Sequence, residues 1–89
     1  MADAELVRNE ILFQCYTVRP GARDATRMAR LARHEGDMPD ATAGDFDREA
    51  AYLVGKGLLE IAREEIARAH IRYRITSAGV DYLEERGLT

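Results

Sequence analysis

The chain has 89 residues, enough for one compact domain and too few for two. With 46% apolar and 33% charged residues, its composition is that of a folded globular protein, not of a disordered or membrane-spanning one. A single cysteine excludes an internal disulfide framework. The acidic first residues lack the apolar core of a secretory signal. We therefore expect one domain over residues 1–89, located in the cytoplasm and without a membrane partner.

The net charge of −3 is unevenly distributed along the chain. Residues 19–34 contain five arginines and one acid, whereas residues 35–49 contain six acids and one arginine. A local field, more than the net charge, attracts or repels a charged partner. The sequence therefore predicts a surface with regions of both signs.

Two amphipathic helices are expected in the first part of the chain. Asp3 is placed to cap a helix that runs to about Val18, with an apolar stripe of Val7, Ile11, Leu12, Cys15 and Tyr16. The residues Arg19-Pro20-Gly21 break this helix. A second helix is predicted from about Asp24 to Glu35 and stopped by Gly36, with an inward stripe of Ala25, Met28, Ala29 and Ala32.

A third helix has the strongest periodicity in the chain. Thr42 followed by Asp45 resembles a capping box, so the helix should begin there, and Gly57 should end it in the left-handed conformation. The apolar positions recur at intervals of three and four: Ala43, Phe46, Ala50, Leu53, Val54 and Gly57. The outward face is predicted to carry Asp45, Arg48, Glu49, Tyr52 and Lys56.

The segment after Gly57 allows two interpretations. Leu58 to Ala69 has good helix propensity, but His70 to Ile75 alternates strictly between apolar and polar residues, as a half-buried strand does. A lone strand needs a partner, so a hairpin with a first strand from Leu58 to about Arg63 is preferred. Thr76 should then cap a last helix through Arg86, stopped by Gly87. The expected core consists of Val7, Ile11, Met28, Ala32, Phe46, Ala50, Leu53, Val54, Ile71, Tyr73 and Ile75, with Val80 and Leu83 inward on the last helix.

Two short motifs, together with this order of elements, resemble those of a known protein family. Leu53-Val54-Gly55-Lys56-Gly57-Leu58-Leu59 is similar to the end of the recognition helix in winged helix-turn-helix regulators of the MarR, PadR and ArsR kinds. Tyr73-Arg74-Ile75-Thr76-Ser77-Ala78-Gly79 is similar to the segment that closes their second wing strand. The resemblance implies an α+β, mostly helical fold with a three-helix core, a β-hairpin wing and a C-terminal helix. It also implies a DNA-binding regulator whose third helix enters the major groove.

Basic residues and one tyrosine, on three elements, are the candidate DNA contacts. They are Arg23, Arg27 and Arg30 on or beside the second helix, Arg48, Tyr52 and Lys56 on the third helix, and Arg68 and Arg72 on the hairpin. Arg48 is the cation best placed to pair with a guanine. Solvated charged faces, and cross-strand pairing of the hairpin arginines with Glu60 and Glu64, are the alternative interpretation.

Other kinds of site find little support in the sequence. No nucleophile–base pair, phosphate-binding loop or metal-ligand spacing is present, so we expect no enzyme activity, no cofactor and no metal. Cys15 lies on an apolar stripe, which favours a buried structural thiol. The alternative function is a winged-helix adaptor that binds another protein through its acidic third helix. A weak homodimer through the terminal helices is expected, led by Leu6, Leu12, Tyr82 and Leu83.

Overall fold

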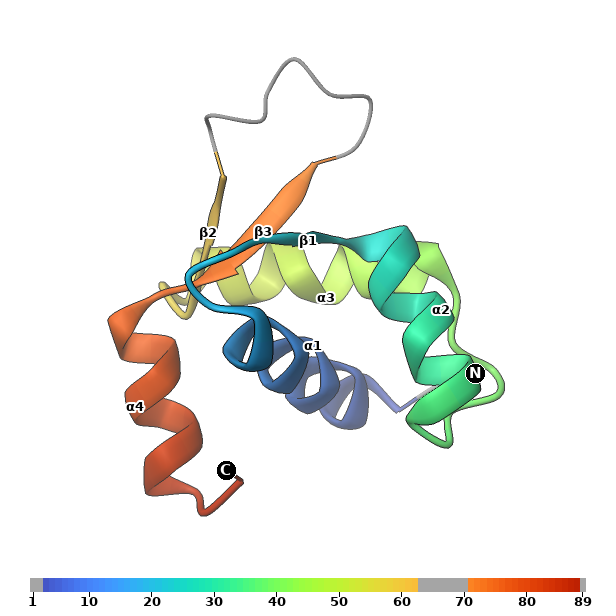
Figure 1. Cartoon of the computed structure of the whole chain (residues 1–89), viewed down its shortest axis with the longest axis horizontal. Helices are drawn as coiled ribbons and strands as arrows, with labels where there is room; N and C mark the ends of the chain where they lie inside the picture. The colour runs from blue at the N-terminus through green and yellow to red at the C-terminus, as the bar shows by residue number, and fades with distance from the viewer. Residues whose placement is uncertain (1–2, 63–70, 89) are drawn as a thin grey trace.

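The computed structural model describes residues 3–62 and 71–88. Within these ranges the elements are α1 (Ala4–Val18), β1 (Arg23–Asp24), α2 (Ala25–Glu35), α3 (Ala43–Gly55), β2 (Leu59–Ile61), β3 (Arg72–Ile75) and α4 (Ser77–Glu85). In the view of Figure 1, α3 runs across the molecule below the sheet, with α2 toward one end and α4 toward the other. The expected α+β, mostly helical class is confirmed.

The four helix starts are the ones that the sequence predicts. The carboxylate of Asp3 accepts a hydrogen bond from the backbone N–H of Glu5 at 2.8 Å. Asp24, Thr42 and Thr76 cap α2, α3 and α4 in the same way, each accepting from the backbone N–H three residues later at 2.8, 3.1 and 3.0 Å. Each cap satisfies a donor that the helix itself leaves without a partner. Local chemistry therefore fixes where each helix begins.

Glycines follow the ends of α2, α3 and α4, as predicted, but only two of the three adopt the left-handed conformation. Gly57 after α3 and Gly87 after α4 have φ values of +79° and +68°, the left-handed conformation that glycine adopts without steric cost. Gly36, by contrast, has φ −100°, so it ends α2 without the left-handed turn. The positive φ there, 58°, belongs to Asp37, one of the few residue types that tolerates it.

The sheet contains the predicted hairpin and one strand that was not predicted. Strands β2 and β3 pair antiparallel, with Leu59 opposite Ile75 and Ile61 opposite Tyr73. The alternative of a helix from Leu58 to Ala69 is therefore wrong for the first residues of that segment, which form β2. The predicted hairpin tip with Glu64 and Glu65 lies outside the described residues. The sheet order is β1-β3-β2, because the two-residue strand β1 pairs with β3 on the other edge.

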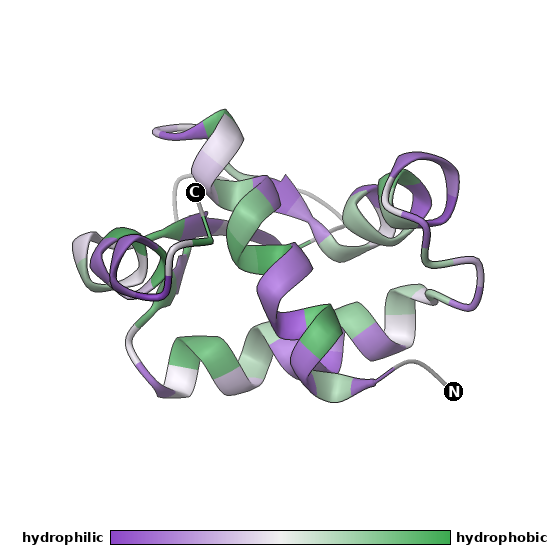
Figure 2. Cartoon of the chain, turned by 90° about the horizontal axis from the view of Figure 1, so that it is seen from below, coloured by the Kyte–Doolittle hydropathy of each residue, from purple (hydrophilic) through white to green (hydrophobic). Residues whose placement is uncertain are grey.

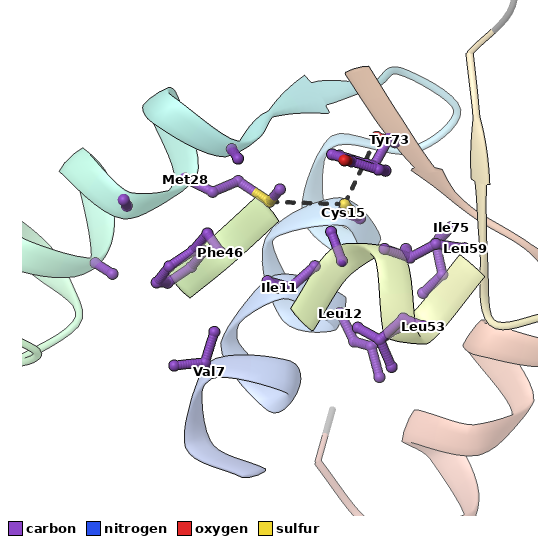
Figure 3. Packing of buried hydrophobic residues seen from close by; sticks show 14 of the residues in the cluster. Val7, Ile11, Leu12, Cys15, Met28, Phe46, Leu53, Leu59, Tyr73 and Ile75 are labelled. Carbon is purple, nitrogen blue, oxygen red and sulfur yellow. Dashed lines mark hydrogen bonds between the residues drawn. The ribbon is translucent and has the colours of Figure 1, made fainter. Parts of the chain in front are cut away.

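One hydrophobic core lies between the helices and the sheet. Figure 3 shows side chains from α1, α2, α3 and β3 converging there, and Phe46 of α3 and Met28 of α2 are each 0% exposed. Along each helix in Figure 2, hydrophobic residues alternate with hydrophilic ones, in keeping with the predicted amphipathic pattern. The expected core is confirmed except at two positions. Val54 is only partly buried. The prediction of Ile71 as a core residue is wrong, because its side chain is 55% exposed next to the start of β3.

Cys15 is a buried structural thiol, as its position on the stripe predicted. Its sulfur lies 4.0 Å from Sδ of Met28 and 3.7 Å from the carbonyl oxygen of Tyr73 (Figure 3). Burial raises the pKa of this thiol to about 12, so the reactive thiolate is strongly disfavoured in the folded protein.

The two sequence motifs contact each other where β2 begins and β3 ends. The hydroxyl of Thr76 donates to the carbonyl oxygen of Gly57 at 2.7 Å, and the backbone N–H of Thr76 donates to the carbonyl oxygen of Leu58 at 3.2 Å. Any side chain at position 79 would collide with the carbonyl oxygen of Leu58, which explains the glycine there. These contacts fix the helix-to-strand and strand-to-helix turns against each other. The arrangement is compatible with the winged helix-turn-helix that the motifs resemble.

Candidate nucleic-acid interface

The connection between α2 and α3 holds the two helices in a fixed relation. Asp37 turns the chain, and the backbone N–H of Met38 donates back to the carbonyl oxygen of Ala32 at 3.1 Å. Nη1 of Arg33 donates to the carbonyl oxygen of Ala41 at 2.9 Å, just before α3 begins. Phe46 of α3 then packs into the core beside α2. The result is a helix, a short turn and a second helix held by backbone and core contacts.

Two of the predicted cations are exposed on α2. Arg27 and Arg30 lie on the face opposite the buried stripe, and both are exposed. The backbone N–H of Arg27 donates a hydrogen bond to the carboxylate of Asp24, the N-cap of α2, at 2.8 Å. Within the described part of the chain, neither guanidinium makes a hydrogen bond or an ion pair. Both charges are therefore available to a partner from solvent.

Arg23 does not join this exposed pair. It lies in β1, is half-buried, and its Nη1 donates to Oε1 of Gln14 at 3.0 Å. Burial is the main cause that lowers the pKa of Arg23. Gln14, itself 5% exposed, donates from Nε2 to the carbonyl oxygen of Met28 at 3.0 Å and to the carboxylate of Glu10 at 2.8 Å. Arg23 thus ties β1 to α1, and the prediction that it belongs to the DNA-contact set is not supported by its position.

The charges of α3 are largely paired with one another. Arg48 donates from Nη2 to Asp45 at 2.9 Å and from Nε to Glu49 at 3.2 Å. Glu49 was predicted to face outward, but its side chain is only 7% exposed, because Arg8 of α1 donates to it at 2.7 Å. The hydrogen bond to Glu49 raises the pKa of Arg8, and Arg48 holds the pKa of Asp45 below its usual range.

An aromatic side chain completes this contact between α1 and α3. The guanidinium of Arg8 lies 3.8 Å from the ring centroid of Tyr52, and Nζ of Lys56 lies 5.6 Å from it. These three side chains, with Asn9 and Tyr82 among others, line a cleft of about 440 Å³. Arg8 was not predicted as a site residue. Arg8 lies three residues before Ile11 and four before Leu12, so it stands at the edge of the apolar stripe of α1. This spacing is the sequence signal that could have placed its side chain beside α3.

The basic residues of the hairpin are engaged within the sheet where the structure describes them. Arg74 donates to Glu60 at 2.8 Å across the strand pair, as the cross-strand alternative predicted. Arg72 is half-buried and lies opposite Asp24 of β1. The hydroxyl of Tyr73 donates to Asp47 at 3.2 Å and ties the sheet to α3, while burial raises the pKa of Tyr73 to about 12. Arg68 and His70 lie outside the described residues.

The residues expected to form a dimer contact divide into two groups. Leu12 and Leu83 are each 0% exposed and belong to the core, so their predicted place at a dimer contact is wrong. Leu6 is exposed and Tyr82 is half-buried.

None of the helices in the described ranges combines the length and hydropathy needed to cross a membrane.

Comparison with known proteins finds no matching family model, no matching curated protein and no matching solved structure. Any functional assignment therefore depends on the arrangement of the side chains themselves.

Proposed function

We propose that this domain binds duplex DNA as a winged helix-turn-helix and acts in transcriptional regulation. In this arrangement α3 enters the major groove, α2 crosses the phosphate backbone, and the β2–β3 hairpin lies beside it. The observation that carries the proposal is the pair Arg27 and Arg30, exposed and without a partner among the described residues, on the helix that precedes α3. Phosphate oxygens are the partners that such guanidinium groups bind best.

The internal pairing of the α3 charges also supports DNA over the alternative. An adaptor that docks through an acidic third helix needs carboxylates on the surface of that helix. Glu49 is buried against Arg8, Asp45 is paired with Arg48, and Asp47 accepts from Tyr73. The repulsion of phosphate by α3 is therefore smaller than the acid content of its sequence suggests.

The exposed face of α3 is also shaped for close approach to a surface. Gly44, Ala51 and Gly55 are exposed beside Arg48 and Tyr52. Small side chains let the helix backbone approach the edges of the bases, and Arg48 and Tyr52 remain exposed beside them. We propose Arg27, Arg30, Arg48, Tyr52 and Lys56 as the main contacts, and leave Arg23 out of the set.

The proposal is tested by measuring the affinity for random-sequence duplex DNA by fluorescence anisotropy at several salt concentrations. The double variant Arg27→Ala with Arg30→Ala should reduce the slope of log K against log salt by roughly two units, since each lost phosphate contact contributes about 0.9. Arg86→Ala, which removes an exposed cation at the C-terminal cap of α4, is the control and should leave the slope unchanged. An equal effect of the double variant and of Arg86→Ala, or no binding to DNA at about 50 mM salt, would contradict the proposal.

A further inference from the structure

The side of α1 that faces away from α3 forms one wall of an open groove. Leu6 and Phe13 lie two turns apart on this side, and they are 59% and 46% exposed. The groove has a volume of about 360 Å³ and is completed by Met38 and by Leu88, which is 40% exposed. We call it the α1 groove. Large apolar side chains gathered at the surface in this way are a common mark of an interaction site.

Backbone hydrogen bonds hold the other walls of the α1 groove in place. After α4, the left-handed turn at Gly87 brings the backbone N–H of Leu88 to the carbonyl oxygen of Leu83 at 3.0 Å. After α2, the turn at Asp37 is closed by the bond from Met38 to Ala32 at 3.1 Å. Both turns follow the pattern in which a helix end is capped by a left-handed residue. The groove is therefore formed before any partner arrives, which reduces the entropy lost on binding.

The charged side chains that line the α1 groove are all acidic. They are Glu10 of α1 and Asp37 of the turn after α2. Glu10 accepts one hydrogen bond, from Gln14 at 2.8 Å, and keeps a second carboxylate oxygen for another donor. The nearest cation on α1, Arg8, points to the opposite side and is held by Glu49. An apolar floor with an acidic rim complements a partner that is apolar and basic.

We propose that the α1 groove binds an amphipathic helix of a partner protein, with apolar side chains along one face and lysine or arginine beside them. This mode of recognition places side chains at i, i+3, i+4 and i+7 into a groove. A second copy of this chain fits less well. A two-fold contact is made by the same patch on both subunits and would bring Glu10 and Asp37 of one copy toward the same acids of the other. The surface goes beyond DNA binding, because it lies on the side of α1 turned away from α3.

The test uses two labelled peptides of about 14 residues, four helical turns, one built of leucine and lysine and the other of leucine and glutamate. Fluorescence anisotropy measures their affinity for the full chain. The leucine–lysine peptide should bind at least about tenfold more tightly than the leucine–glutamate peptide. Phe13→Ser should weaken the binding of the leucine–lysine peptide by about tenfold or more. Ile71→Ser, which changes another exposed apolar residue next to β3, should leave this binding unchanged.

A second variant tests the acidic rim without altering the shape of the groove. Glu10→Gln keeps an oxygen that accepts from Gln14, and Asp37→Asn keeps a residue that tolerates the left-handed turn. The two changes together should weaken the leucine–lysine peptide and reduce the salt dependence of its binding. The proposal is overturned if both peptides bind equally, or if Phe13→Ser and the rim variant bind the leucine–lysine peptide like the wild type. It is also overturned if sedimentation shows a dimer of the chain that Phe13→Ser dissociates.

Discussion

The outer faces of α2 and α3 are both rich in charged side chains, but the two helices hold their charges differently. On α2, Arg27 and Arg30 extend into solvent without a partner in the described part of the chain. On α3, Arg48 is shared between Asp45 and Glu49, and Glu49 is also bound by Arg8. The comparison teaches that the net charge of a helix does not give the field at its surface. By sequence α3 is the acidic helix, yet most of its carboxylates are already neutralised, whereas the cations of α2 remain available.

This comparison depends on α2 and α3 being held in one relative position, and Phe46, the largest fully buried side chain among the described residues, belongs to the core that they share. It is 0% exposed and comes from the first half of α3. We expect Phe46→Ala to lower the free energy of unfolding by about 3–5 kcal/mol, the usual cost of truncating a buried phenylalanine. Urea denaturation measures the change. Ile71→Ala, at an exposed position, should cost less than about 0.5 kcal/mol, and similar losses for both would show that Phe46 is not the anchor.

The parts of the fold that sequence could predict are those set by neighbouring residues. The caps at Asp3, Asp24, Thr42 and Thr76 each act over two or three residues. The apolar stripes follow from the repeat of the helix, and Gly57 and Gly87 end helices because they accept a positive φ. The hairpin follows from the alternation around Tyr73 and the need of a strand for a partner.

The parts that sequence missed depend on contacts between distant segments. Strand β1 has two residues, too few for a periodic pattern, and exists only because β3 offers it an edge. Glu49 is buried by Arg8, which is 41 positions away in the chain. Ile71 continues the alternation of the strand, but it precedes Arg72, the first paired residue of β3, and is 55% exposed. The sequence predicted the candidate site less well than the fold, because the partners of Arg23, Arg48 and Glu49 decide which charges a ligand can reach.

The buried side of α2 offers a second test of the same packing. Cys15 contacts Met28 there, and burial raises the pKa of its thiol from 9.0 to about 12. The unfolded chain therefore releases this proton near pH 9 while the folded chain keeps it, so stability falls as pH rises from about 9 toward 12. The expected loss from this group is about 1.4 kcal/mol per pH unit in that window. Urea denaturation between pH 8 and 10, below most of the Tyr73 titration, should show a shallower decline for Cys15→Ala. Equal declines would mean that the thiol is not shielded beneath α2.

The smallest expected effect bears directly on the difference between α2 and α3. Asp45 holds Arg48 at 2.9 Å, so Asp45→Asn removes a charge that competes with phosphate for this guanidinium. If the proposed DNA interface is correct, affinity for random duplex should rise, and the slope of log K against log salt should steepen by up to about 0.9 as Arg48 gains a phosphate contact. Asp81→Asn makes the same change at an exposed position of α4 and should alter neither quantity. Anisotropy titrations of both variants, at the salt concentrations used for the Arg27 and Arg30 variant, provide the measurement. An unchanged slope for Asp45→Asn would mean that α3 contributes shape alone, and that phosphate binding depends on α2.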